Sequence, residues 1–448
     1  MKKTVSEKTL FFVLIFISSL FVISCGGGGS GSGAEGGEGG NSVAVTKSEY
    51  VVFSWNDLGM HCLNPTYDVL TILPPYNNLI AQVVKRGDPP AIVTSGITVE
   101  YRIINNTYSY GKTDSLGAVF AEFWDNALTL FGVNLPVDKG LNLVDPKTNN
   151  GLSGTMTAGT DHYEAIGIPL TPVDDNGVWN PYQVAEITVK DIQGTVLAKT
   201  RTTAPTSDEI SCNGCHNAND PFNDILAAHD RLHGTNLTSQ KPVLCANCHG
   251  SPALGQSGPG SSGLYLSYAV HNSHSTRGAA CYDCHPGNTT KCSRSIAHTA
   301  SDGNCVTCHG TMSQVASSIS SGARIPWLNE PKCFTCHNVS GVDTGATLYR
   351  NARGHGNIFC ASCHGSPHAM VPTNQDADNY QAVQYQGRAK TIGSCGACHS
   401  GSRGEGSSEF GESHGGSNPE RYSACNICHT SVSTDTSRWP HAFQWKNR

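Results

Sequence analysis

One five-residue pattern, Cys-x-x-Cys-His, constrains this chain more than any other feature, because it occurs eight times after residue 211. The eight copies are Cys212/Cys215/His216, Cys245/Cys248/His249, Cys281/Cys284/His285, Cys305/Cys308/His309, Cys333/Cys336/His337, Cys360/Cys363/His364, Cys395/Cys398/His399 and Cys425/Cys428/His429. Residues three and four apart on a helical turn lie on the same face, so both sulfurs and the histidine of each copy point the same way. Two sulfurs at this spacing can add to the two vinyl groups of one porphyrin, and the histidine can bind its iron from the same side.

Zinc ribbons and redox dithiols also contain Cys-x-x-Cys, but they need no histidine at this fixed position. The eightfold repeat therefore predicts eight covalently attached haem c groups, with the paired cysteines as attachment residues and the motif histidines as proximal iron ligands.

A second set of histidines matches the demand for a sixth iron ligand. Beyond the motifs, the region from residue 217 onward contains nine more: His229, His233, His271, His274, His298, His355, His368, His414 and His441. Eight irons with two histidines each need eight of them, so we interpret all nine as candidate distal ligands. We expect the spare one to be His368 or His441, and Met312 and Met370 are alternative axial ligands.

The N-terminus has the layout of a lipoprotein signal peptide. Three early lysines precede an apolar stretch from Leu10 to Ile23, which is too short to span a bilayer comfortably. It ends in Val-Ile-Ser-Cys25, which looks like a lipobox, so we predict a signal peptide at residues 1–24 and lipidation of Cys25. The alternatives are an ordinary signal peptide with an incidental cysteine, or an uncleaved anchor helix. Residues 25–47 then comprise Cys25 and a Gly/Ser-rich tether, and Gly26 in place of aspartate favours the outer membrane.

Composition supports a cofactor-filled interior and argues against one class of partner. Only 14% of the residues are charged and 49 are glycine, so side chains alone would build a thin core. The formal net charge is −6, and haem propionates would make the protein more acidic. Nucleic acid is therefore not an expected partner.

The pattern of hydrophobic residues changes near residue 208. Residues 50–55, 97–103 and 185–190 alternate or run β-branched, and residues 185–200 have the pattern of a hairpin. We predict an immunoglobulin-like, antiparallel β-sandwich domain over residues 48–207. Residues 208–448 are predicted to form a loop-rich, cofactor-packed octahaem cytochrome c domain with short helices.

One segment of the front domain, WNDLGMHC at residues 55–62, has no role in this scheme. Its His61 and Cys62 could bind a metal ion or cap a haem across the domain interface. Cys62 and Cys292 are the two cysteines left after Cys25 and the motif cysteines are set aside. In an oxidising compartment they could form a disulfide, remain free thiols, or take a metal role, and the sequence leaves these three alternatives open.

The second half resembles the multihaem c-type cytochromes of metal-reducing, electroactive bacteria, including outer-surface and nanowire-type members. The matching stretches are AAHDRLHG, VLCANCHGSPA, CYDCHPGNTTKCSRS, CVTCHG and GHGNIFCASCHGSPHA. The resemblance covers residues 211–448 and, through WNDLGMHC, part of the front domain. It implies closely stacked, low-potential, bis-histidine haems in a nearly continuous chain.

Two functions from different classes fit these features. The first is electron transfer at the outer membrane without any catalytic residue, from haem to haem and on to a partner cytochrome, a conduit protein or a metal or mineral acceptor. In this function the front domain could also serve as a docking module. The alternative is a multihaem reductase of a small anion such as nitrite, hydroxylamine or tetrathionate, which needs one five-coordinate haem. A high-spin iron signal would favour the reductase.

Overall fold

The computed structural model describes residues 48–87, 89–113, 120, 122–145, 147–287, 289–299, 305–336 and 347–400. Several predicted features lie outside these residues: the signal peptide, Cys25 and the tether, the last motif (Cys425, Cys428, His429), and His337, His414 and His441. Within the described part, no helix combines the length and apolar composition needed to cross a membrane.

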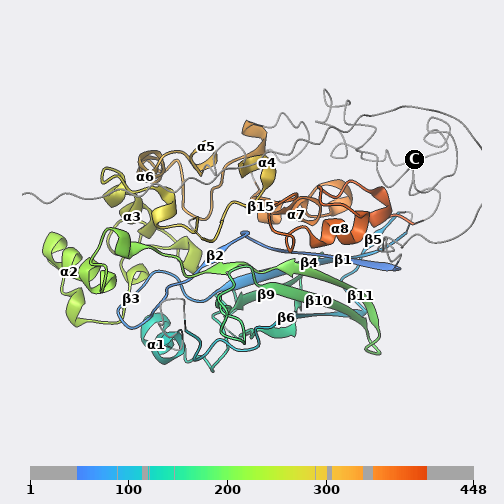
Figure 1. Cartoon of the computed structure of the whole chain (residues 1–448), viewed down its shortest axis with the longest axis horizontal. Helices are drawn as coiled ribbons and strands as arrows, with labels where there is room; N and C mark the ends of the chain where they lie inside the picture. Colours follow the sequence, from blue (N-terminus) through green and yellow to red (C-terminus); the bar gives the residue numbers. More distant parts are fainter. Residues whose placement is uncertain are drawn as a thin grey trace, which may run out of the picture. The chain divides into compact units, whose positions relative to one another are not determined.

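The front of the chain, residues 48–207, forms two antiparallel sheets, which confirms the prediction of a sheet-rich domain (Figure 1). The first sheet has the order β1 (Tyr50–Asn56), β4 (Asn77–Lys85), β9 (Tyr163–Ile168) and β8 (Thr157–Ala158), with β5 (Ala91–Ile92) also paired to β4. The second has the order β11 (Val196–Thr203), β10 (Val184–Asp191), β6 (Ile97–Ile103) and β7 (Ser153–Thr155). The predicted hairpin is β10–β11, closed by a turn in which Asp191 accepts hydrogen bonds from two backbone amides.

Alternating side chains from both sheets form one shared core. Val99, Tyr101 and Ile103 of β6 are buried, whereas Arg102 between them is exposed. They pack with buried residues of β10 and with Leu79 of β4 from the facing sheet. This alternation is the period-two pattern of a strand with one face on the core.

β1 differs, because it is buried on both faces. Its inward residue Val52 joins the core between the sheets, while Phe53 and Trp55 face the other way. There Phe53 packs on Tyr385 at 5.2 Å between ring centres, and Trp55 on Phe359 at 5.0 Å. A strand covered on both faces has a nearly continuous apolar run, which is what YVVFSW is.

The rear of the chain, from residue 208 onward, therefore packs directly on the first sheet. Figure 1 shows α7 (Cys360–His364) and α8 (Tyr380–Gln386) on one side of β1 and β4, with β10 and β6 on the other. The Tyr385 hydroxyl donates to the Val52 carbonyl at 2.6 Å. Packing is thus continuous across the composition change near residue 208.

Two short parallel pairs lie near the boundary between front and rear. β2 (His61–Cys62) pairs with β12 (Thr206–Ser207) within the front, and β3 (Leu70–Thr71) pairs with β13 (Val243–Leu244) of the rear. In its described residues the rear consists of loops and short helices, as predicted, and of one two-stranded pair, β14 (Gly365–Ser366) with β15 (Ala369–Met370). Its longer helices are α2 (Pro221–His233), α3 (Leu266–His274) and α6 (Met312–Ser320).

The front also contains a helix that the sequence analysis missed, α1 (Glu122–Phe131). Phe123, Trp124, Ala127 and Leu130 are buried on one side of it, and this spacing is the helical period. The segments on both sides of it are β-like, so no helix was predicted at these residues.

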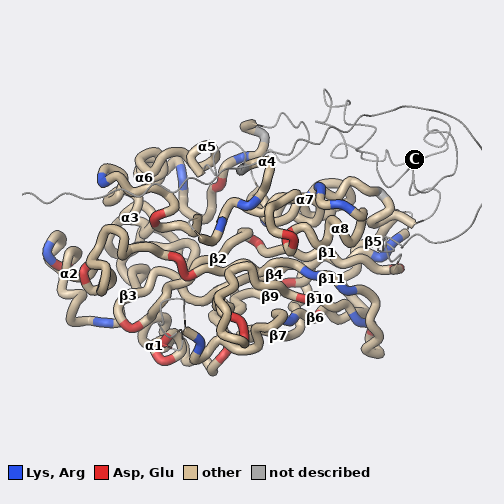
Figure 2. The backbone as a smooth tube through the Cα atoms, viewed as in Figure 1, with Lys and Arg blue, Asp and Glu red and all other residues tan. Residues whose placement is uncertain are grey.

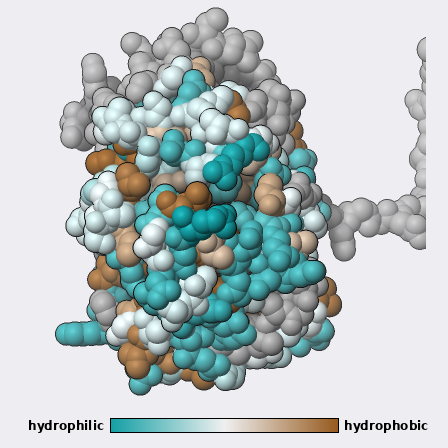
Figure 3. Space-filling view, turned by 90° about the vertical axis from the view of Figure 1, so that its left-hand side faces the viewer, coloured by the Kyte–Doolittle hydropathy of each residue, from teal (hydrophilic) through white to brown (hydrophobic). Residues whose placement is uncertain are grey.

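Charged residues are sparse, and both signs are interspersed along the described chain (Figure 2). The face that carries α2 is mostly hydrophilic, with apolar residues in small separate groups (Figure 3). Leu232 of α2 and Leu264 before α3 are among the exposed apolar side chains.

One charged pair joins front and rear and makes a pH-dependent contribution to stability. Arg353 donates to Asp161 at 2.8 Å, and this hydrogen bond holds the pKa of Asp161 at about 2. A carboxyl with a lowered folded-state pKa stabilises the fold above its unfolded pKa of about 3.9, and the contribution is lost as the pH falls toward 2. We expect Asp161→Asn to lower the free energy of unfolding at pH 7 by about 1 kcal/mol, since the pair is partly exposed.

Urea unfolding of the variant and the wild type at several pH values checks this expectation. The difference between the two proteins should shrink between pH 4 and 2. Glu49→Gln, which removes the exposed partner of Lys85, is the control and should change little. A difference that stays constant down to pH 2 would contradict the prediction.

Candidate metal centres

Each described motif begins a tight helical turn at its first cysteine. The turns are η1 (Cys212–Gly214), η3 (Cys245–Asn247), η5 (Cys281–Asp283), α5 (Cys305–His309), η6 (Cys333–Thr335), α7 (Cys360–His364) and η9 (Cys395–Ala397). In the first of them, the Cys212 carbonyl accepts from the Cys215 amide at 3.2 Å and from the His216 amide at 2.9 Å. The second and third motifs repeat this arrangement. Such a turn brings the two sulfurs and the imidazole to the same side of the backbone.

The motif cysteines differ in how far the surrounding chain covers them. Five of them are exposed: Cys215, Cys248, Cys308, Cys333 and Cys336. Cys308 lies in α5, where the first cysteine of the motif, Cys305, is only partly exposed. Cys336 directly follows η6, and there both cysteines of the motif are exposed.

The physical reason for this difference is that a single short turn has one side against the chain and the other toward solvent. In the first two motifs the first cysteine, Cys212 or Cys245, packs against the apolar cluster around Leu70, so the second cysteine is left outside. The turns at Cys308 and Cys336 belong to the loop-rich rear, where few apolar side chains are available to cover a sulfur. A thiol must be accessible to add to a vinyl group, so exposure of Cys308 and Cys336 is compatible with a role in attachment.

The sixth and seventh motifs are better covered. Cys363 and Cys398 are only partly exposed, and Cys398 packs against the cluster that covers β1. Burial raises the pKa of each thiol to about 12. The described motifs therefore range from partly covered to exposed, although their backbone turns are similar.

Five motif histidines face one additional histidine each at nearly the same separation. The pairs and the distances between ring centres are His216–His274 (6.3 Å), His249–His229 (6.3 Å), His285–His271 (6.2 Å), His309–His368 (6.1 Å) and His399–His355 (6.3 Å). Two imidazoles that bind one metal ion from opposite sides, each at about 2.0–2.1 Å, hold their ring centres about 6.3 Å apart. The five pairs therefore fit an iron between their rings.

The described residues contain no group of three or more His, Cys, Asp or Glu side chains that could hold a metal ion. A haem iron does not need such a group, because the porphyrin supplies its four other ligands and the protein supplies the axial ones. Two histidines and two cysteines per site are the donor set that a haem c requires.

Hydrogen bonds orient these imidazoles through Nδ1 and leave Nε2 available. Six of the ten paired histidines have an Nδ1 partner within the chain: His216 with Asp224 (3.1 Å), His229 with Thr235 (2.9 Å), His249 with Ser262 (2.9 Å), His271 with the Ser267 carbonyl (2.7 Å), His274 with the Val270 carbonyl (2.8 Å) and His368 with the Leu58 carbonyl (2.9 Å). A carbonyl can only accept, so in the last three the proton is on Nδ1 and the lone pair is on Nε2. This is the tautomer of a metal ligand held by a second hydrogen bond.

Burial favours the neutral form of several of these imidazoles, which is the form that binds a metal ion. Burial lowers the pKa of His309 to about 4, and the neighbouring His368 adds to the effect. Burial likewise lowers the pKa values of His229, His271 and His368.

Helix α3 contributes to two of the histidine pairs. His271 and His274 are three residues apart near its C-terminus, so they lie on the same face. Each donates from Nδ1 to the carbonyl of the residue four positions earlier in the helix. Their partners His285 and His216 belong to different motifs, so these two candidate centres are neighbours.

Helix α2 supplies His229. Asp220 caps the N-terminus of this helix, Pro221 occupies its first position, and Gly234 ends it in a left-handed conformation. Beyond Gly234, Thr235 both contacts His229 and donates to Asp230, which fixes the position of the hydroxyl.

Other candidate histidines fall outside the five pairs in different ways. His233, at the exposed end of α2, has its ring 4.8 Å from His229 rather than opposite any motif histidine among the described residues. His298 is in α4 (Ile296–Thr299), and His364 ends α7. His368, one of the two histidines that we expect to be spare, has its ring opposite that of His309.

The structure places His61 and Cys62 in β2. The Nε2 atom of His61 lies 2.8 Å from the buried Asp57 carboxylate, which orients the imidazole. Cys62 and Cys292 are free thiols, and no disulfide joins them in the structure. Burial raises the pKa of Cys292 to about 11 and also raises the pKa of Cys62, to which the neighbouring Cys292 contributes.

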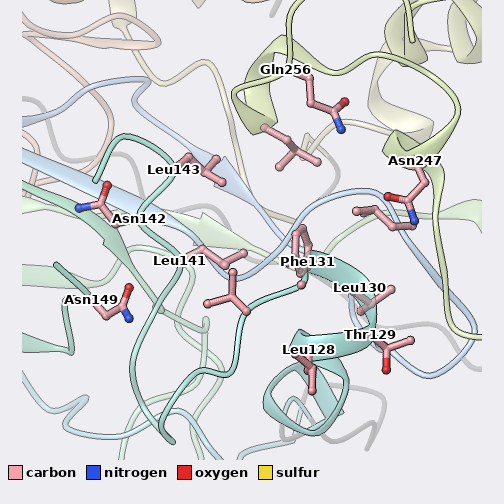
Figure 4. A pocket seen from close by; sticks show the side chains of 14 residues that line it. Leu128, Thr129, Leu130, Phe131, Leu141, Asn142, Leu143, Asn149, Asn247 and Gln256 are labelled. Atoms are coloured by element: carbon pink, nitrogen blue, oxygen red, sulfur yellow. The ribbon is translucent and has the colours of Figure 1, made fainter. Parts of the chain in front are cut away.

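A cavity of about 500 Å³ lies beside the second motif (Figure 4). Its walls include Leu130 and Phe131 of α1, Leu141 from a front loop, and Asn247 from the motif turn. None of its lining residues is a cysteine, histidine or carboxylate, so it is not a metal centre.

Comparisons with protein-family models, with curated proteins and with solved structures find no match for this chain.

Proposed function

We propose that this protein is a multihaem c-type cytochrome that transfers electrons among eight covalently bound haems. The observation that carries the proposal is the set of five histidine pairs at 6.1–6.3 Å, each containing one motif histidine. Five independent pairs at the separation that two axial ligands require are difficult to explain by ordinary packing. When bound, the haem iron supplies one-electron redox chemistry.

The residues of the chain have three tasks in this proposal. The paired cysteines would bind the porphyrin covalently, the motif histidines and their facing histidines would bind the iron, and the partners of Nδ1 would hold each imidazole in orientation. The shared helix α3 brings two centres close together, which suits electron transfer between them. With histidine on both sides, the five paired centres would leave no axial position for a substrate, which favours electron transfer over the reductase alternative.

The proposal extends to the cellular setting. The lipoprotein signal at Cys25 would tether the protein to the outer membrane, where other multihaem cytochromes, conduit proteins or a metal or mineral acceptor would exchange electrons with it. The front sheets would form an immunoglobulin-like sandwich that supports the haem-binding half.

The test is the mass and spectrum of the full chain purified from a host with intact cytochrome maturation. We expect a mass increment of eight haems and a low-spin spectrum. Cys245→Ser with Cys248→Ser should lower the count by one, whereas Cys62→Ser with Cys292→Ser, the matched control, should leave it unchanged. A mature chain without any bound tetrapyrrole would refute the proposal, and a dominant high-spin signal would favour the reductase.

A further inference from the structure

The proposed function leaves the segment WNDLGMHC, residues 55–62, without a role. This segment contacts His368, which lies opposite His309. The Leu58 carbonyl accepts the hydrogen bond from Nδ1 of His368 at 2.9 Å. The ring of His368 lies 6.1 Å from that of His309. A front-domain backbone atom is thus the orienting partner of a rear-domain ligand.

The next residue, Gly59, is fitted to this contact. Its φ of +81° is in the left-handed region that favours glycine. A Cβ at this position would lie 3.0 Å from the backbone nitrogen of His368 and 3.4 Å from its Cβ. Any side chain at residue 59 would therefore push against His368 itself.

The turn that presents the Leu58 carbonyl is fixed from within the front domain. The side chain of Asn56 accepts from the Leu58 amide at 3.1 Å and from the Gly59 amide at 2.7 Å. Asp57, next in the turn, is held by His61 at 2.8 Å and by Asn78 at 2.8 Å. The buried dyad of Asp57 and His61 therefore has a structural role in the turn.

Arg294 secures the same contact from the rear domain. Its side chain donates to the Gly59 carbonyl at 2.8 Å, and its backbone amide donates to the His368 carbonyl at 2.8 Å. One residue thus fixes both the turn and the ligand segment.

We infer that the turn of residues 57–59 is a positioning element for His368, which fixes its Nδ1 proton and aims Nε2 at the space opposite His309. This inference rests on the proposed function. A carbonyl that accepts from Nδ1 makes an imidazole a stronger donor to a metal ion. Through this turn, the front domain therefore affects how His368 binds one of the eight irons and the midpoint potential of that iron.

The experiment compares Gly59→Ala with Gly177→Ala in the full haem-loaded chain. Gly177 also has a positive φ, of +76°, but a Cβ there would meet no atom within 4 Å, so it controls for backbone strain alone. We expect Gly59→Ala to convert one iron in eight from low-spin to high-spin, as His368→Ala should, and added imidazole to restore the low-spin signal. Gly177→Ala should keep all irons low-spin.

Asn56→Ala is a second variant that loosens the turn without adding bulk, in case Gly59→Ala fails to fold. It should shift the potential of the same single iron. Eight low-spin irons with wild-type potentials in folded Gly59→Ala and Asn56→Ala proteins would overturn the inference. The haem count of the wild type is measured first, because a chain without haem refutes the proposed function instead.

Discussion

Replacing His271 and His274 together by methionine is expected to raise the midpoint potentials of two irons. Both residues are in α3, and each lies opposite a different motif histidine. Methionine is a weaker donor than imidazole and favours the reduced iron, so we expect a rise on the order of 0.1 V at each centre, within the about 0.8 V that axial ligands span. Methionine is also a good helix former, so α3 should persist.

A spectroelectrochemical titration of the full haem-loaded chain measures this effect. The midpoint potentials of two of the eight irons should rise, and those of the other six should stay unchanged. His233→Met is the matched control, because His233 is exposed in α2 and faces no motif histidine among the described residues. Potentials that are identical in the wild type and the double variant would exclude His271 and His274 as ligands.

Arg294→Met is expected to cause the largest loss of stability of any single substitution considered. Arg294 is 1% exposed, and it donates to both carboxylate oxygens of the buried Asp378 at 2.7 and 3.1 Å. Thr203 of β11 also donates to this carboxylate. Removing the cation leaves a buried carboxylate without its charge partner, which costs about 3–5 kcal/mol.

Urea unfolding of the haem-loaded protein checks this expectation. Arg294→Met with Asp378→Leu should recover much of the loss, because no unpaired charge then remains buried. Arg102→Met, which removes an exposed partner of Glu186, should have little effect. A single Arg294 variant as stable as the wild type would show that the pair does not hold front and rear together.

Part of the fold could be predicted because its causes are local. The alternation in residues 97–103 and 185–190 corresponds to β6 and β10, each with one face on the core. The uninterrupted apolar run at the start corresponds to β1, which is buried on both faces. What covers its second face could not be predicted, because Phe359 and Tyr385 come from a distant part of the chain.

The exposure of individual motif cysteines could not be predicted either. Cys308, Cys336 and Cys363 occupy the same position of the motif, yet the first two are exposed and the third is only partly exposed. The motif fixes only the local turn, whereas the covering of each sulfur depends on which distant segment packs beside it.

His61 shows where a local signal was overlooked. Asp57 precedes it by four residues, a spacing at which a carboxylate can reach the imidazole, and the structure places the two side chains 2.8 Å apart. The contact fixes the orientation of the His61 imidazole within the buried turn.

The sequence by itself determined the number and positions of the Cys-x-x-Cys-His motifs and, among the described residues, the turn that each of them forms. Two sulfurs and an imidazole within five residues depend only on the geometry of one helical turn. Tertiary structure alone decided which second histidine lies opposite each turn. His229 precedes the motif histidine that it faces, whereas His368 follows its own by many residues. Such pairs form only when separate segments pack together, and no spacing along the chain encodes that packing.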